Sequence, residues 1–228
     1  MKQILTLLLV VYFSNSFGQF AIVADKDNFV NVRKDAAPNS KVIDELPNGQ
    51  LIYCFAGKGN WTNIDYHKNG KDGNGYVYKD RYKMVSNFPS LRSLKKSVNK
   101  VTFKQDSIEV SVSQVKFDTK KHKFKYFRSN PNQIELIDKQ RYWGTDGAMP
   151  TTQFSEISIK IGNKTMLIHT KAIAGLYQPN LDNVKVNYDK RNQIIYIQAM
   201  NSDGAGSYLV IWKVENGKYK DRLVAFGF

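Results

Sequence analysis

Residues 207–226 read SYLVIWKVENGKYKDRLVAF, and this stretch decides the fold class. Two runs rich in β-branched and aromatic residues, Leu209–Val214 and Tyr219–Val224, flank the pair Asn216-Gly217. A two-residue hairpin turn requires positive φ at both central positions, and Asn followed by Gly meets this requirement. The stretch therefore predicts an antiparallel β-hairpin.

The same signals recur along most of the chain, where short β-branched and aromatic runs alternate with Gly, Asn, Asp and Pro. Further hairpin turns are predicted at Asp189–Asn192 and at Gly162-Asn163. Only Leu91–Lys100 and Lys171–Tyr177 have weak helical character. We predict strands at Phe20–Ala24, Lys41–Leu46, Leu51–Phe55, Trp61–Tyr66, Tyr76–Tyr78, Val101–Lys104, Ser107–Phe117, His122–Phe127, Gln133–Ile137, Phe154–Ile161, Thr165–Thr170, Val184–Tyr188, Gln193–Gln198, Ser207–Val214 and Arg222–Phe226.

Composition narrows the class of protein. The 228 residues are 42% hydrophobic and 24% charged, which excludes wholesale disorder and suggests one or two domains. The single cysteine, Cys54, cannot form an intramolecular disulfide, and it is expected to be a small buried hydrophobe. Three scattered histidines do not suggest a metal centre, and no HExxH, GxSxG, GxxxxGK[ST] or GxGxxG motif occurs. We expect no cofactor and no metal.

Residues 1–18 read MKQILTLLLVVYFSNSFG and have the layout of a secretory signal peptide. Lys2 precedes a ten-residue apolar stretch, Ile4–Phe13, and the small residues Ser16 and Gly18 precede a cleavage site before Gln19. Ten apolar residues are too few to span a bilayer. The mature protein is expected to be exported, either periplasmic or secreted, and to have no transmembrane segment.

Charge is unevenly distributed over the mature chain. Residues 20–86 carry 10 basic and 8 acidic residues, whereas residues 87–228 carry 23 basic and 12 acidic residues. The charge shift coincides with Asn87–Ser90, which also interrupts the strand pattern. We therefore divide the chain into a first domain at 19–86, a linker at 87–100 and a β-rich second domain at 101–228.

The basic excess is densest at Lys120–Arg128, KKHKFKYFR. Alternation predicts an amphipathic strand, with a solvated face of Lys121, Lys123, Lys125 and Phe127 and a core face of His122, Phe124, Tyr126 and Arg128. Basic residues interleaved with aromatics can also bind nucleic acid, but an exported protein rarely meets it. We expect an anionic surface as a partner and no nucleic acid.

Residues 20–86 resemble the bacterial Src-homology-3-type (SH3-like) domain of exported proteins. The resemblance rests, in order, on Phe29–Arg33 (FVNVR), the turn Ala37–Ser40, Lys41–Gly49, Gly59–Ile64 (GNWTNI) and Gly75–Val77 (GYV). It covers about 65 residues and departs from the family pattern at Asp65–Asn74, which is predicted to be a long inserted loop. The expected fold is all-β: a small SH3-like barrel followed by a larger, mostly antiparallel β domain.

The resemblance implies binding rather than catalysis, with cell-wall peptide or an envelope protein as partner. In Trp61–Tyr66, alternation places Trp61 and Asn63 opposite the expected core residue Ile64. Tyr76 and Tyr78 likewise lie opposite Val77. Trp61, Asn63, Tyr76 and Tyr78 are therefore candidate ligand-binding residues, although Trp61 can equally cover an open end of the barrel.

The second domain has two unusual Asp-Gly stretches, Tyr142–Gly147 and Asn201–Tyr208. Trp143, Asp146 and Asp203 are candidate binding residues on that basis. Asp-Gly is also the residue pair that tight turns require, which is the more common reason for it. The leading hypothesis is an exported, non-catalytic binding protein. The alternative is a cell-envelope hydrolase that uses Asp146, Glu156 or Asp203, in which Asp146 and Asp203 could meet across the sheet as an acid/base pair.

Overall fold

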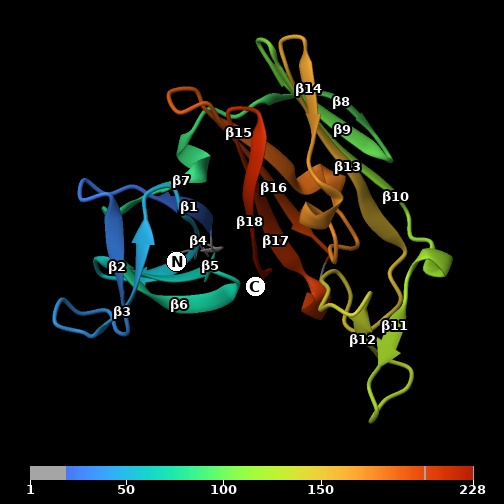
Figure 1. Cartoon of the computed structure of the whole chain (residues 1–228), viewed down its shortest axis with the longest axis horizontal. Helices are drawn as coiled ribbons and strands as arrows, with labels where there is room; N and C mark the ends of the chain where they lie inside the picture. Colours follow the sequence, from blue (N-terminus) through green and yellow to red (C-terminus); the bar gives the residue numbers. More distant parts are fainter. Residues whose placement is uncertain (1–18, 203, 228) are drawn as a thin grey trace, which may run out of the picture.

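The computed structural model describes residues 19–202 and 204–227, and the predicted signal peptide lies outside them. The described chain is nearly all antiparallel β, which confirms the predicted fold class. Three sheets are stacked on one another (Figure 1). Among the described residues, no helix is long and apolar enough to cross a membrane.

The first sheet contains seven strands in the order β3-β2-β6-β5-β4-β1-β7 and curls on itself. Its curl brings β2 against β6 at the pair Arg33↔Tyr76. Gly75 allows this approach, because a Cβ there would lie 2.5 Å from Val32 Cγ1. The strands are β1 (Gln19–Val23), β2 (Phe29–Arg33), β3 (Val42–Pro47), β4 (Leu51–Lys58), β5 (Trp61–Lys68), β6 (Lys71–Tyr78) and β7 (Tyr82–Met84).

The second half of the chain forms a middle sheet, in the order β15-β16-β17-β18, and an outer sheet, in the order β14-β13-β10-β9-β8. The middle sheet contains β15 (Val184–Asp189), β16 (Ile194–Asn201), β17 (Tyr208–Glu215) and β18 (Lys218–Phe226). The outer sheet contains β8 (Arg92–Ser97), β9 (Lys100–Gln105), β10 (Ile108–Lys116), β13 (Thr152–Ile161) and β14 (Lys164–Leu167).

A separate two-stranded hairpin, β11 (Phe124–Tyr126) and β12 (Ile134–Ile137), extends from the outer sheet (Figure 1). The turn predicted at Asn216-Gly217 is confirmed, because both residues have positive φ and join β17 to β18. The remaining elements are short 3-10 turns: η1 (Val85–Asn87), η2 (Thr119–Lys121), η3 (Thr170–Ala172), η4 (Leu181–Asn183) and η5 (Gly204–Gly206).

The middle sheet is buried on both faces. On one face it packs against the outer sheet, in a core that includes the fully buried Trp212. On its other face, Tyr196 and Leu223 pack against Phe20 and Tyr53 of the first sheet. Burying apolar surface stabilises the folded state by about 25 cal/mol per Å², so such a contact is a major source of stability. The first sheet and the middle sheet therefore share a hydrophobic core.

The connection between the two halves is also structured, which corrects the predicted linker at 87–100. Leu91 N donates to Val186 O, and Tyr188 N donates to Pro89 O, so this segment runs along the edge of β15. Asn187 Nδ2 donates to Phe88 O in a buried hydrogen bond of 2.8 Å. These contacts hold the two halves in one relative orientation.

Two expectations about local structure were wrong. Leu91–Lys100 is not weakly helical, because Arg92–Ser97 pairs with β9 as an exposed edge strand. Asp65–Asn74 is not a long loop, because β5 and β6 continue through it to a tight turn. The weak helical character predicted at Lys171–Tyr177 is found only at the start of this segment, which contains part of the 3-10 turn η3 (Thr170–Ala172).

The strand predicted at His122–Phe127 is shorter than expected. It spans Phe124–Tyr126, and the predicted lysine face is exposed as expected. Tyr126 and Arg128, which were assigned to the core face, are exposed as well, because β11 pairs only with β12 and has no sheet over its tip. His122 and Phe124 are half-buried.

Candidate functional site

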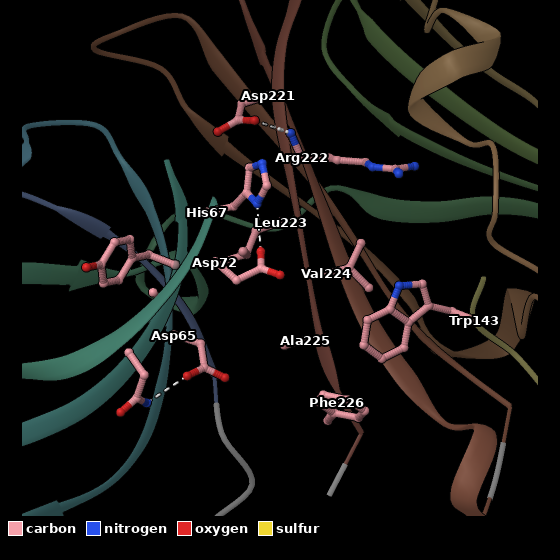
Figure 2. A pocket seen from close by; sticks show the side chains of 13 residues that line it. Asp65, His67, Asp72, Trp143, Asp221, Arg222, Leu223, Val224, Ala225 and Phe226 are labelled. Carbon is pink, nitrogen blue, oxygen red and sulfur yellow. Dashed lines mark hydrogen bonds and ion pairs between the residues drawn. The ribbon is translucent and has the colours of Figure 1, made fainter. Parts of the chain in front are cut away.

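A cleft of about 590 Å³ separates the β5–β6 hairpin of the first sheet from β18 of the middle sheet (Figure 2). Its walls come from segments that are far apart in the sequence. The side chains with polar or aromatic chemistry that line it are Asp65, Tyr66, His67, Asp72, Asn74, Trp143, Asp221, Arg222 and Phe226. A concave site with a few convergent polar groups and aromatic walls is the usual form of a ligand pocket.

One wall of the cleft continues the outer face of the β5–β6 hairpin. Four cross-strand pairs follow one another along this face: Trp61↔Tyr78, Asn63↔Tyr76, Asp65↔Asn74 and His67↔Asp72. On β5 and β6, residues 62, 64, 66 and 77 are buried, whereas 61, 63, 65, 76 and 78 are partly exposed. The predicted alternation is therefore confirmed for β5 and for Tyr76–Tyr78. We call these four pairs the hairpin face.

Hydrogen bonds hold the polar part of the hairpin face in place. Asn74 Nδ2 donates to Asp65 Oδ1 at 2.7 Å and to Asn63 Oδ1 at 3.1 Å. His67 Nδ1 lies 2.7 Å from Asp72 Oδ1. At the other end, the rings of Trp61 and Tyr78 meet edge to face, with centroids 5.4 Å apart. These contacts within the hairpin fix the positions of the side chains on its face.

Local sequence explains why this hairpin forms. Asn69 and Gly70, with φ of 53° and 76°, occupy the turn between β5 and β6. The Tyr66 ring covers Gly73, its cross-strand partner, so closely that a Cβ on Gly73 would lie 2.3 Å from the ring. The two strands therefore extend to Lys68 and Lys71 and carry His67 and Asp72 into the cleft.

The opposite wall presents a carboxylate with unusual electrostatics. Asp221 is half-buried, and this desolvation raises the pKa of its carboxyl group, although His67, Lys213 and Arg222 act in the opposite direction. Desolvation also lowers the pKa of Arg222, whose Nη1 donates to Ala172 O and Ala174 O. In Figure 2 the His67 ring lies between Asp72 and Asp221.

Trp143 forms the far end of the cleft. Its backbone is held by a parallel bridge to Leu176, and Gly144, with φ of 111°, allows this approach because a Cβ there would lie 2.2 Å from Tyr177 O. The half-buried indole packs against Phe226 with ring centroids 4.8 Å apart. Trp143 is therefore attached to the core and also contributes an apolar wall to the cleft.

The structure brings together five of the seven candidate residues named from the sequence. Trp143 lines the cleft, and Trp61, Asn63, Tyr76 and Tyr78 lie on the hairpin face that leads to it. Asp146 does not line the cleft; it is exposed in a loop where Gly147 has φ of 77°, as a turn requires. Asp203 lies outside the described residues.

Sequence reasoning missed His67, Asp72, Asp221 and Arg222. The first two were assigned to an inserted loop, and the last two lie on a strand whose neighbour across the cleft is about 150 positions earlier. One signal could have revealed the first pair. The alternation of Trp61–Tyr66 continues through His67, and Asn69-Gly70 is a hairpin turn signal.

Other potentially reactive groups lie outside the cleft. Cys54 is a free, buried thiol, and burial raises its pKa to about 12. His122 Nδ1 lies 2.6 Å from Asp138 Oδ2, and the ring stacks on Phe117. Glu156, a residue of the alternative hydrolase, is exposed on β13. Within 19–202 and 204–227, no three His, Cys, Asp or Glu side chains form a group that could hold a metal ion.

Comparison with models of known families, with curated proteins and with solved structures finds no match to this chain.

Proposed function

We propose that the protein is an exported, non-catalytic binding protein that holds an extended peptide along the hairpin face, with one end of the peptide in the cleft. The observation that supports this most is the continuity of the four cross-strand pairs with the cleft. From Trp61 to His67 the face is about 20 Å long, at ~3.3 Å per residue. An extended peptide of about six residues matches this length.

The chemistry of the face changes along its length. The Trp61–Tyr78 end offers a rigid aromatic surface, which binds apolar groups with little loss of side-chain entropy. The centre offers the amides of Asn63 and Asn74, which suit peptide groups. At the cleft end, Asp65, Asp72 and Asp221 provide carboxylates.

The carboxylates at the cleft end favour a ligand with an ammonium group. Asp221 has no ion-pair partner among the described residues, and a bound cation would supply one. This local charge differs from that of the whole chain, which is +14. Among the partners that the resemblance to SH3-like domains implies, a cell-wall peptide with a free amino group fits best.

The test uses the mature chain, residues 19–228, and soluble peptides released from bacterial cell wall, with binding measured by calorimetry. Trp61→Ala and Asp221→Asn are each expected to weaken binding at least tenfold. Phe127→Ala and Asp106→Asn are matched controls, because they remove an exposed aromatic ring and an exposed carboxylate far from the cleft. Unchanged affinity in Trp61→Ala and Asp221→Asn would refute the proposal.

The alternative, a cell-envelope hydrolase, is favoured by one observation. Asp221, a carboxyl group with a raised pKa, lies in a cleft beside the His67–Asp72 pair, and such groups are enriched in acid/base sites. Incubation with insoluble wall material distinguishes the two functions. Release of soluble fragments by the intact chain, lost in Asp221→Asn, would favour the hydrolase.

Export has its own test. All described strands begin at or after Gln19, so cleavage before Gln19 removes none of them. Expression of the full chain in a bacterium, followed by N-terminal sequencing of the product outside the cytoplasm, should give QFAIV as the first residues. A product that retains Met1 in the cytoplasm would contradict this part of the proposal.

A further inference from the structure

The β11–β12 hairpin and its flanks, residues 118–141, form a basic arm that projects from the body of the molecule on the side away from the first sheet (Figure 1). Three acidic residues lie in the same segment, at 118, 135 and 138. Seven basic residues of the arm are exposed: Lys120, Lys121, Lys123, Lys125, Arg128, Lys139 and Arg141.

The acidic residues of the arm are already engaged within it. Asp118 pairs with Lys121, Glu135 pairs with Lys125 at 2.8 Å, and Asp138 pairs with His122. Within the described part of the chain, the other five basic residues of the arm have no ion-pair partner. The arm therefore keeps a surplus of unpaired cations in solvent.

Aromatic side chains are exposed at the tip of this basic segment. Tyr126 is 42% exposed and Phe127 is 39% exposed, and residues 128–132, which follow them, are all exposed. By contrast, Phe124, at the base of the arm, packs against the buried Phe117. The Phe124 ring is therefore packed against the protein core, whereas the rings of Tyr126 and Phe127 are exposed to solvent.

The base of the arm is held firmly, so the tip is presented in a set position. The His122 ring stacks on Phe117 with centroids 4.5 Å apart, and its Nε2 lies 3.2 Å from Gln153 Oε1 on β13. Lys123 N donates to Asp138 Oδ1, which joins the two ends of the hairpin. Binding at the tip would therefore not require the arm to become ordered first.

We propose that the basic arm docks the protein onto an anionic lipid surface, a property that goes beyond the proposed peptide binding. Unpaired cations are attracted to anionic headgroups, and this attraction decays within about 8 Å at physiological ionic strength. Aromatic side chains favour the boundary between headgroups and acyl chains. A polar polyanion would use the cations but not the exposed Phe127 ring, so the combination favours lipid.

The experiment is cosedimentation of the mature chain, residues 19–228, with vesicles of phosphatidylcholine alone or with 30% phosphatidylglycerol. We expect sedimentation only with the anionic vesicles, and its loss at high salt. The double variant Lys123→Glu/Arg128→Glu should reduce the bound fraction at least tenfold, and Phe127→Ser should reduce it severalfold without a change of charge. Absence of sedimentation with anionic vesicles would overturn the proposal.

A matched charge control lies on the outer sheet. Lys95→Glu/Lys100→Glu changes the net charge by the same amount at exposed residues on β8 and β9. If the bound fraction of this control fell as much as that of Lys123→Glu/Arg128→Glu, the proposal would be overturned, because the attraction would then depend only on the net charge. If Phe127→Ser sediments as well as the unmodified chain, the arm binds polyanions in general and the lipid assignment is wrong.

Fluorescence supplies a second readout that does not depend on sedimentation. Phe127→Trp should show a blue shift of its emission with anionic vesicles, because the ring enters a less polar layer. Val98→Trp is the control, since Val98 is 84% exposed at the turn between β8 and β9. A shift of the same size in both variants would contradict insertion of the tip.

Discussion

His67 and Asp72 face each other across the β5–β6 hairpin, with His67 Nδ1 2.7 Å from Asp72 Oδ1, at the point where the hairpin face enters the cleft. Asp72 is 94% exposed in its side chain, so solvent screens this pair. A polar pair exposed to this extent contributes little to the free energy of folding. Both residues line the cleft, where they are accessible to a ligand.

His67→Ala should therefore change the free energy of unfolding by ~1 kcal/mol or less. The same substitution should weaken peptide binding, because His67 and its partner line one wall of the cleft. Urea denaturation and calorimetric binding measure the two effects. A large loss of stability with unchanged binding would show that the pair is structural.

Asp221→Asn should stabilise the protein at neutral pH. Burial raises the folded-state pKa of Asp221 above its unfolded value, so the folded state binds the proton more tightly and loses stability as the pH rises through the interval between the two values. Asn keeps an oxygen that can accept from Arg222 N. The stabilisation should fade as the pH falls below about 4, near the unfolded pKa.

Asp25→Asn is the control for this effect and should act in the opposite direction. The hydrogen bond from Asp27 N, and then the bond from Arg81, lower the pKa of Asp25. Its contribution to stability is present above the unfolded pKa and is lost as the pH falls through the folded value. Thermal melts of both variants between pH 3 and pH 8 measure the two trends. If the stability of both variants changed with pH in the same direction, the opposite pKa shifts of Asp221 and Asp25 would be contradicted.

Tyr196→Phe should be neutral or stabilising by about 1 kcal/mol. Tyr196 is fully buried between the first and middle sheets, and its hydroxyl has no hydrogen-bond partner among the described residues. Tyr208 is equally buried, but its hydroxyl donates to Tyr177 O at 2.9 Å, so Tyr208→Phe should cost about 1–3 kcal/mol. Denaturant titrations of the two variants test the difference. Equal losses would mean that the Tyr196 hydroxyl has a partner.

Cys54 should not react with a thiol reagent at pH 8 while the protein is folded. Burial raises its pKa to about 12, and the thiolate is the reactive form. A Val98→Cys variant, carrying an exposed thiol, should react at one site when folded and at two after denaturation. Mass spectrometry counts the modified sites. Rapid modification of Cys54 in the folded protein would show that the first sheet opens easily around this residue.

The fold class and most strands follow from local sequence. The alternation in Trp61–Tyr66 assigned the correct residues to each face of β5, because side chains of a strand alternate strictly between its two faces. Asn216-Gly217 identified the β17–β18 turn for an equally local reason, since few residue pairs tolerate positive φ at both positions.

Where local sequence preferences are weak, tertiary contacts determine the conformation of the chain. Arg92–Ser97 carries no core side chain and is a strand only because β9 supplies hydrogen bonds for its backbone. The connection at 88–91 has a fixed path because its backbone forms hydrogen bonds with the edge of β15. Neither partner can be identified from the segment's own residues.

The sequence by itself determined the outward side chains at one end of the hairpin face, Trp61, Asn63, Tyr76 and Tyr78, because side chains alternate strictly along a strand. Only the tertiary structure decided that this face ends in a cleft against Asp221 and Trp143. The cleft depends on how Phe20 and Tyr53 of the first sheet pack on Tyr196 and Leu223 of the middle sheet. Hydrophobic packing of this kind is non-directional and joins residues far apart in the chain, so no local pattern records it.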